Sequence, residues 1–228
     1  IAYGETAADG GRLGLPGGDV PLADHSPSLA IARGVGMVHQ HFMLVPTLSV
    51  VENVVLGREP TRGPFLELGG VAKEVMSLAE RLGYAVDPWR RIEELSVGEQ
   101  QRVEILKVLW RGAEVLLLDE PTAVLSPLEV ADLLGVLRKL ATAGKSIVLV
   151  SHKLDEVQAV AERITVMRRG VVVATFERGA SSSVIASAML GREPDPPQRA
   201  AKATAESRTA LDVKGLGVHR ADGTEAVR

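Results

Sequence analysis

Two adjacent carboxylates, Asp119 and Glu120, come directly after the apolar run of residues 115–118. A continuous apolar run is typical of a buried strand, and ligands of α/β sheets bind at the carboxyl ends of strands. A carboxylate at Asp119 suits a Mg²⁺ ion and its water shell, and Glu120 is placed to polarise an attacking water. Two acidic residues alone more often form a solvated turn, so a function here needs support from other residues.

Residues 95–107, LSVGEQQRVEILK, begin with the pattern of a capped helix. Ser96 is the expected N-cap, and Glu99 three residues later completes a capping box. The same geometry suits phosphate, because Gly98 allows a close approach to the backbone at a helix N-terminus and Ser96 adds a hydroxyl. Taken alone, an ordinary amphipathic helix is the simpler interpretation.

Two further groups of polar residues follow apolar runs. These two groups and the two described above are called stations. Gln40 comes after the run of residues 35–38, and Ser151 and His152 come after residues 147–150. A single Gln or His at a strand end is usually a loop residue. The order of all four stations along the chain is what gives them weight.

The tripeptide Gly144-Lys145-Ser146 matches the end of a phosphate-binding P-loop, G-x-x-x-x-G-K-[ST]. The first glycine of that pattern would stand where this chain has Lys139, and the residues that follow are a β-branched strand run rather than a helix start. We therefore predict that Gly144 ends a helix over residues 127–142 and binds no phosphate.

The elements that must position these residues are strands and helices in alternation. The continuous apolar runs predict strands buried on both faces of a parallel sheet that helices cover. The expected fold class is α/β, with a mostly parallel sheet and an inserted helical segment. The other predicted elements are helices over residues 49–56, 71–82 and 99–110, a capping box at 126–129, and a hairpin over 163–176 around Arg169 and Gly170.

Composition excludes several other classes. The chain has 228 residues, 46% hydrophobic and 24% charged, with a net charge of −3 and no cysteine. A disulfide framework and thiolate metal sites are excluded, and no basic patch suggests nucleic acid as a partner. No apolar run approaches the roughly 18 residues needed to cross a bilayer.

At this point the sequence resembles the nucleotide-binding domain of ATP-binding cassette (ABC) transporters, over residues 1 to about 192. The four stations correspond to its Q-loop, signature, Walker B and H-loop, in that order, and the residues that follow Glu120 up to Ser126 correspond to its D-loop. A narrower resemblance is to the first cassette of tandem ATPases of simple-sugar and nucleoside importers, carried by GMVHQHFMLVPTLSVVENVVLG, LSVGEQQRVEILKVLWRGA and DEPTAVLSPLE.

The resemblance implies a P-loop NTPase-type core over residues 1–42 and 111–192 and a helical subdomain over 43–110 that docks a membrane permease. A linker over 193–209 and the start of a second cassette over 210–228 would follow. The implied cofactors are ATP and Mg²⁺, and the implied partners are permease subunits, a second cassette and, indirectly, a substrate-binding protein. The implied location is the cytoplasmic face of the cell membrane.

The same resemblance implies residue roles. Gln40 and Asp119 would bind Mg²⁺, with Gln40 also sensing the permease. Glu120 would be the general base, and His152 would contact the γ-phosphate as a switch. The nucleotide held by the opposing cassette would bind the signature, to which we assign Ser96, Gly98, Glu99 and Gln100.

The chain departs from the family pattern at two motifs. Glu99 stands where the signature usually has Gln, and Ser126 stands where the D-loop usually has Asp. The contact that the D-loop Asp makes between cassettes is therefore not transferred to Ser126. Neither departure removes a catalytic residue.

A third departure is that no P-loop is present in residues 1–228. Residues 1–4 suggest the end of a helix, so the P-loop is expected just upstream, in a longer chain. Without it we expect these 228 residues alone neither to bind ATP tightly nor to hydrolyse it.

Of two alternatives, the first is disfavoured and the second stays open at this stage. A chromosome-maintenance ATPase of the same superfamily would carry a long coiled coil between Q-loop and signature. Here about 55 residues with prolines and no sustained heptads separate Gln40 from Ser96. A cassette that has lost catalysis and acts as a binding or regulatory module is the other alternative. Glu120 and His152 argue against that module, and the missing P-loop argues for it.

Overall fold

The computed structural model describes residues 1–62, 65–191, 214, 217–219 and 225–227. The chain divides into two units, Ile1–Glu193 and Pro194–Arg228. All of the predicted site residues lie in the first unit.

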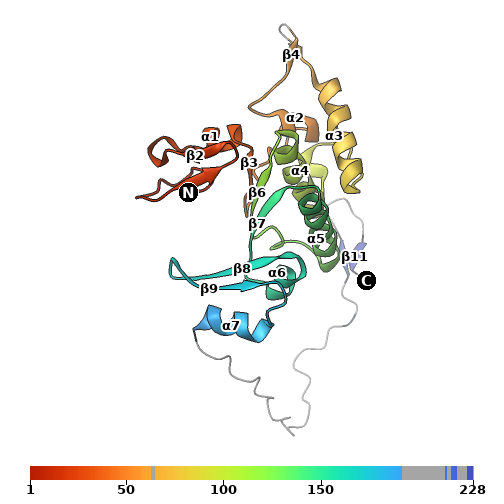
Figure 1. Cartoon of the computed structure of the whole chain (residues 1–228). Coiled ribbons are helices and arrows are strands. Elements are labelled where there is room, and N and C mark those ends of the chain that lie inside the picture. The colour runs from red at the N-terminus through yellow and green to blue at the C-terminus, as the bar shows by residue number, and fades with distance from the viewer. Residues whose placement is uncertain (63–64, 192–213, 215–216, 220–224, 228) are drawn as a thin grey trace. The chain divides into compact units, whose positions relative to one another are not determined.

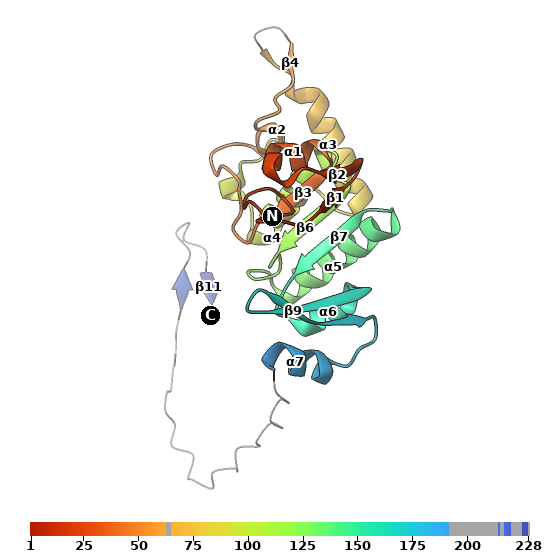
Figure 2. The same cartoon turned by 60° about the vertical axis from the view of Figure 1, so that its left-hand side comes forward.

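The three apolar runs form the strands of one parallel sheet. Its strands are β3 (Val35–Val38), β6 (Val115–Asp119) and β7 (Ser146–Val150), in the order β3-β6-β7. Val38 pairs with Leu118, and Asp119 pairs with Val150. The strands lie side by side in Figure 2. The predicted parallel α/β sheet is thus confirmed.

The prediction that these strands are buried on both faces is wrong for β7. Ile147 and Leu149 pack against the core, whereas Val148 and Val150 are 51% and 53% exposed. β7 is one of the two edge strands of this sheet, and the face that carries its two valines is about half exposed. A continuous apolar run therefore did not mean double burial here, because only one face meets a helix layer.

Helices lie between β3 and β6 in the sequence, as predicted. They are α2 (Val50–Val55), α3 (Leu68–Leu82) and α4 (Val97–Trp110), with the short hairpin β4 (Thr61–Arg62) and β5 (Phe65–Leu66) and the 3-10 turn η2 (Ile92–Glu94) between them. Figure 1 shows them grouped around one end of the sheet. Helix α3 begins three residues before its predicted start. Apolar side chains of α2, α3 and α4, among them Val54, Val75 and Ile105, join Leu116 and Leu118 in one core.

Helix α5 (Pro127–Thr142), between β6 and β7, has the predicted bounds. Ser126 caps it, and Gly144 adopts a left-handed φ of +91° just beyond its end. Lys145 pairs with Glu114 at 2.7 Å, and Ser146 begins β7. The Gly-Lys-Ser tripeptide is therefore a helix-to-strand turn, as predicted, and not a strand-to-helix phosphate loop.

The N-terminal part contains β1 (Leu13–Leu15), β2 (Gly18–Val20), the 3-10 turn η1 (Leu22–Asp24) and α1 (Pro27–Ala32). β1 and β2 form an antiparallel hairpin. Residues 1–4, predicted as a helix end, form a turn in which the Gly4 N–H donates to the Ile1 carbonyl at 2.8 Å.

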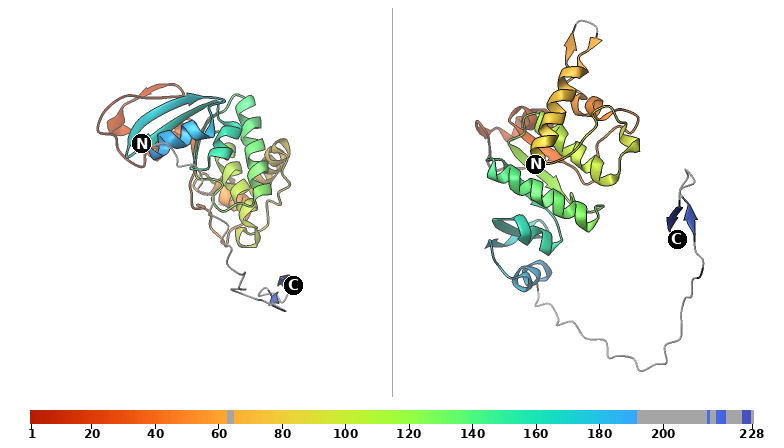
Figure 3. Two further views of the ribbon diagram at one scale, coloured as in Figure 1. Left: turned by 90° about the horizontal axis from the view of Figure 1, so that it is seen from below. Right: turned by 90° about the vertical axis from the view of Figure 1, so that its right-hand side faces the viewer.

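A smaller layer follows β7. It contains α6 (Leu154–Val160), the hairpin β8 (Arg163–Arg168) and β9 (Val171–Glu177), and α7 (Ser182–Leu190). Arg169 and Gly170, both at positive φ, form the predicted turn between β8 and β9. Ile164, Val166 and Ile185 form a second core, and the right-hand view of Figure 3 shows this layer below α5.

The second unit is described only in part. β10 (Val218–His219) and β11 (Glu225–Val227) form an antiparallel pair. The predicted linker over 193–209 lies outside the described residues, as does most of the strand expected from Leu211 onward. In the part of the chain that the structure describes, every helix is too short or too polar to span a bilayer.

Candidate functional site

The sheet register brings three of the predicted stations to one edge. Gln40 and His152 each stand two residues beyond the last residue of β3 and β7, and Glu120 directly follows the last residue of β6. Because these three strands are parallel neighbours, their carboxyl ends lie at the same edge of the sheet. Sequence reasoning predicted this grouping from the apolar runs that precede each residue.

Glu120 is held in an uncommon conformation against His152. Its φ is +45°, in the left-handed region that side chains other than glycine rarely adopt, and its N–H donates to the Val150 carbonyl at 2.9 Å. The Glu120 Oε1 and the His152 Nδ1 are 2.8 Å apart. The Glu120 side chain is 18% exposed and that of His152 is 70% exposed. Backbone strain of this kind concentrates at functional sites.

Acceptor atoms at this edge are left without partners. The Glu120 Oε2 is buried and accepts no hydrogen bond. Within the described residues, Asp119 has neither a hydrogen bond nor an ion pair to its carboxylate, and the exposed Gln40 side chain has none either. Buried and half-buried oxygens without protein partners are suited to a water molecule, a cation or a ligand proton.

A buried polar network behind this edge was missed by sequence reasoning. The fully buried Thr122 donates from its hydroxyl to Glu156, and Lys153 donates to the Thr122 carbonyl at 2.9 Å. Lys153 also pairs with Glu156 at 3.2 Å. The network ties the turn after Glu120 to the residue after His152. The only signal in the sequence was a polar residue in each turn.

The first turn of α4 is stabilised by its own neighbours. The Ser96 hydroxyl accepts from the Glu99 N–H at 3.3 Å, and the Glu99 carboxylate accepts from the Ser96 N–H at 2.7 Å and from Arg90 at 2.8 Å. Burial acts to raise the pKa of Glu99, but the hydrogen bonds from Ser96 and the charge of Arg90 outweigh it, and the pKa is lowered. The Gln100 amide donates to the Leu95 carbonyl at 3.1 Å. The predicted capping box is confirmed.

The backbone at Gly98 is approached by a carboxylate of the same chain. A Cβ added at Gly98 would lie 2.0 Å from the Glu129 Oε1, so this carboxylate lies close against the Gly98 backbone. Hydrogen bonds from Ser126 are the largest cause of the lowered pKa of Glu129. The close approach that the sequence assigned to a phosphate is thus possible at Gly98, and in this structure Glu129 makes it.

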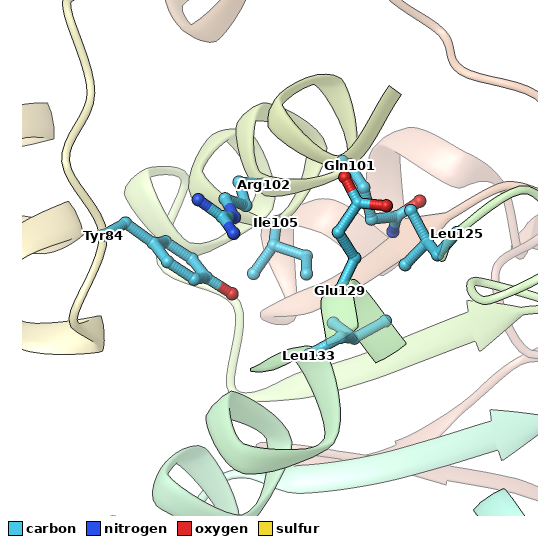
Figure 4. A pocket seen from close by; sticks show the side chains of 8 residues that line it. Tyr84, Gln101, Arg102, Ile105, Leu125, Glu129 and Leu133 are labelled. Carbon is cyan, nitrogen blue, oxygen red and sulfur yellow. The ribbon is translucent and has the colours of Figure 1, made fainter. Parts of the chain in front are cut away.

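A cavity of about 10 Å³ lies between α4 and α5 beside Gly98, with room for about one water molecule. The Tyr84 hydroxyl and the Gln101 Nε2 are buried there without a hydrogen-bond partner. Figure 4 shows side chains of the two helices facing each other across it, and Arg102 lies over the Tyr84 ring at 4.9 Å from its centroid.

The two groups of predicted residues are not joined. The strand-end group is Gln40, Asp119, Glu120 and His152, and the helix-start group is Ser96, Gly98, Glu99 and Gln100. Within the described residues, no hydrogen bond or ion pair links a member of one group to a member of the other.

Comparison with known proteins adds the following. Residues 2–123 match the model of the ABC transporter family. The chain is 46% identical over 204 residues to the nucleoside import ATP-binding protein NupA of Lactococcus lactis subsp. cremoris, covering 89% of this chain and 40% of that protein. It is 39% identical over 231 residues to the guanosine import ATP-binding protein NupO of Bacillus subtilis, covering 100% of this chain and 44% of that protein.

A third relative is the ribose import ATP-binding protein RbsA 3 of Rubrobacter xylanophilus, 45% identical over 170 residues that cover 74% of this chain and 34% of that protein. The chain therefore spans about two fifths of the length of these curated relatives.

Solved structures with the same fold are ATP-binding cassettes. A nucleotide-free cassette from an ABC transporter superposes with a TM-score of 0.67 at 22% identity, over 78% of this chain and 74% of that one. A dimeric cassette in a post-hydrolysis state bound to ADP and Pi superposes with a TM-score of 0.61 at 25% identity, over 79% and 78% of the two chains.

Proposed function

Because this chain belongs to the ABC transporter family, we propose that it is part of the ATP-hydrolysing subunit of an importer. The observation that carries the proposal is the contact between Glu120 and His152 at the carboxyl edge of the sheet, 2.8 Å between carboxylate and imidazole. A carboxylate at a strand end, with one oxygen held and the other without a partner, is suited to accept a proton from an attacking water.

In this proposal Glu120 is the general base and His152 fixes its orientation. The left-handed backbone at Glu120 and the hydrogen bond from its N–H to Val150 hold the carboxylate at the edge before any ligand binds. His152 is the more exposed of the two, so its second ring nitrogen remains available for a phosphate oxygen. A base held in place in this way requires little reorganisation during the reaction.

The free carboxylate of Asp119 and the amide of Gln40 fit a Mg²⁺ ion, which takes oxygen ligands and usually keeps several waters. When bound, such an ion neutralises charge on the phosphates of ATP. The residues themselves orient the site, because Asp119 ends β6 and Gln40 follows β3 on the neighbouring strand.

We assign Ser96, Gly98, Glu99 and Gln100 to the nucleotide held by an opposing cassette. Ser96 and the Gly98 N–H would bind the γ-phosphate, and Glu99 and Gln100 would hold the first turn of α4 in shape. The Glu129 carboxylate now lies close against the Gly98 backbone. Two anions repel each other at this distance, so binding of a phosphate here requires the Glu129 carboxylate to move away.

The proposed substrates are nucleosides or simple sugars, on the basis of the relatives above. The proposed partners are permease subunits, a second cassette and, indirectly, a substrate-binding protein, at the cytoplasmic face of the membrane. The proposed organisation is an ATPase core over residues 1–42 and 111–192, a helical subdomain over 43–110, a linker over 193–209 and a further cassette from 210.

The test uses the protein in its natural length, assembled with its permease subunits in liposomes that contain ATP and Mg²⁺. Uptake of labelled guanosine, adenosine and ribose is measured with the binding protein present. ATP-dependent uptake of a nucleoside or a sugar is the expected result. A protein that binds ATP but hydrolyses none would instead support the regulatory module.

A further inference from the structure

The backbone of Met43, three residues after Gln40, is held on both sides by one helix. Its N–H donates to the Glu104 Oε1 at 2.5 Å, and its carbonyl accepts from the Lys107 Nζ at 2.8 Å. Glu104 and Lys107 lie three positions apart on α4 and therefore on the same face. Both hydrogen-bonding groups of a single loop residue thus depend on two side chains of α4.

Taking the charged groups of Glu104 and Lys107 out of water costs free energy. The Glu104 and Lys107 side chains are only 4% and 12% exposed, and their charged atoms are 3.8 Å apart. Burial lowers the pKa of Lys107, and the charge of Glu104 acts against that shift. Apolar residues of similar size often stabilise a buried site as well as an ion pair does. The charged groups of Glu104 and Lys107 serve another purpose, because they hold the Met43 backbone in place.

A second helix holds the same segment. The fully buried Asn53 of α2 accepts from the Val45 N–H at 2.7 Å and donates to the Val45 carbonyl at 3.1 Å. Residues 43–45 are therefore attached to α2 and α4 and follow any movement of these helices. The Met43 side chain itself is largely exposed, so a partner molecule can reach it.

Helix α4 links this attachment to the signature. Ser96 caps its first turn, and Glu104 stands eight residues further, about 12 Å along the axis at 1.5 Å per residue. The helix is packed along its length, with Gly98, Val103, Ile105 and Leu106 buried. Because a packed helix moves as a rigid element, a displacement applied at Met43 would be transmitted to Ser96 and Gly98.

We propose that Glu104 and Lys107 are positioning residues that couple the segment after Gln40 to the first turn of α4. They touch neither nucleotide nor partner, and they act by holding Met43 to the helix that carries Ser96 and Gly98. The inference rests on the proposed function, in which Gln40 and Ser96 serve the nucleotide and the segment between them faces the permease.

The first test measures attachment without any activity. Amide hydrogen exchange of Met43 is compared in the natural-length protein and in its Glu104→Ala variant, with thermal unfolding measured in parallel. The expected result is exchange roughly tenfold or more faster at Met43, with buried amides of β6 unchanged, because local opening is separate from global unfolding. Equal exchange at Met43 in the two proteins would overturn the attachment.

The second test measures coupling in the natural-length protein assembled with its permease in nanodiscs. Lys107→Met removes the ammonium at similar size, and Lys107→Arg keeps a charged donor. Lys145→Met is the matched control, because Lys145 also pairs with a glutamate, at the amino end of β7. Hydrolysis is measured with and without loaded binding protein.

We expect Lys107→Met to lose about tenfold in stimulated hydrolysis, within the usual range of coupling between sites, while basal hydrolysis stays within about twofold. Lys107→Arg should restore part of the stimulation, and Lys145→Met should behave as wild type. Full stimulation in Lys107→Met, beside a stimulated wild type, would overturn the coupling alone. A wild type without any hydrolysis would instead overturn the proposed function, and the exchange result at Met43 would still stand.

Discussion

The carboxyl edge of the sheet and the first turn of α4 differ in whether their polar groups have hydrogen-bond partners within the chain. At the sheet edge, the Glu120 Oε2 is buried without a partner and Asp119 has none among the described residues. At the start of α4, Ser96, Glu99 and Gln100 all find hydrogen-bond partners within the chain. The sheet edge therefore keeps acceptors available for a ligand, whereas the helix start is complete without one.

This difference separates stability from chemistry. A satisfied capping box stabilises a helix by itself, whatever it later binds. Carboxylates without partners and a strained backbone cost free energy in the folded state, and such costs are typical of functional sites. Substitutions at the edge should therefore mainly change activity, and substitutions at the helix start should change both stability and activity.

The largest effect is expected for Glu120→Gln in the natural-length protein. Loss of the proposed general base should lower the kcat for ATP hydrolysis by roughly 10²- to 10⁴-fold, with little change in the affinity for ATP. Steady-state and single-turnover hydrolysis measure the rate, and ATP binding is measured separately. The control is Glu162→Gln at an exposed carboxylate. A rate within threefold of wild type would remove Glu120 from the chemistry.

Next in size is the comparison of Ser96→Ala with Ser49→Ala. Both serines cap a helix in a complete capping box, so each variant should lose about 1 kcal/mol of stability in chemical unfolding. Only Ser96→Ala should also slow ATP hydrolysis, at least tenfold, because a hydrogen bond to a charged group is worth roughly 1.5–3 kcal/mol. Equal activities in the two variants would show that Ser96 is a cap and nothing more.

A smaller effect concerns pH. The pKa of Glu99 is lowered in the folded protein. Between this lowered pKa and the ordinary pKa of a glutamate, the unfolded chain therefore binds more protons than the folded one. The stability from its hydrogen bonds is fully present above that range and is lost as the pH falls through the lowered value. Glu99→Gln should therefore lose less stability than wild type between pH 6 and pH 3 in urea unfolding. Parallel curves for the two proteins would contradict this.

The smallest effect is expected at the Gly-Lys-Ser turn, which belongs to neither region. Lys145→Met removes an ion pair with the exposed Glu114 and should change the free energy of unfolding by less than about 1 kcal/mol. ATP binding by the natural-length protein should not change. A large loss of ATP affinity would show that this lysine serves a phosphate after all.

Sequence reasoning worked best where the signal is local. The capping boxes at Ser96 and Ser126, the turn at Arg169 and Gly170, and the helix end before Gly144 each depend on a few neighbouring residues. It failed at β7, because the exposure of Val148 depends on which elements lie over the sheet. The single apolar run is compatible with either outcome.

The contacts of the candidate site join residues that lie far apart along the chain, so sequence reasoning could not predict them. The strand-end positions of Gln40, Glu120 and His152 followed from apolar runs, but their order β3-β6-β7 came from the tertiary structure. The approach of Glu129 to Gly98 joins residues 31 positions apart, and the attachment of Met43 to Glu104 joins residues 61 positions apart. No periodicity in the sequence predicts either pair.

The sequence by itself determined which segments become helices and strands and which polar residues stand at their ends, because hydrophobic periodicity and capping act over a few residues. Only the tertiary structure decided which of these ends meet. It placed Glu120 against His152, left Asp119 without a partner and set a carboxylate over Gly98. These outcomes depend on the packing of distant elements, where burial and hydrogen-bond satisfaction are decided for the molecule as a whole.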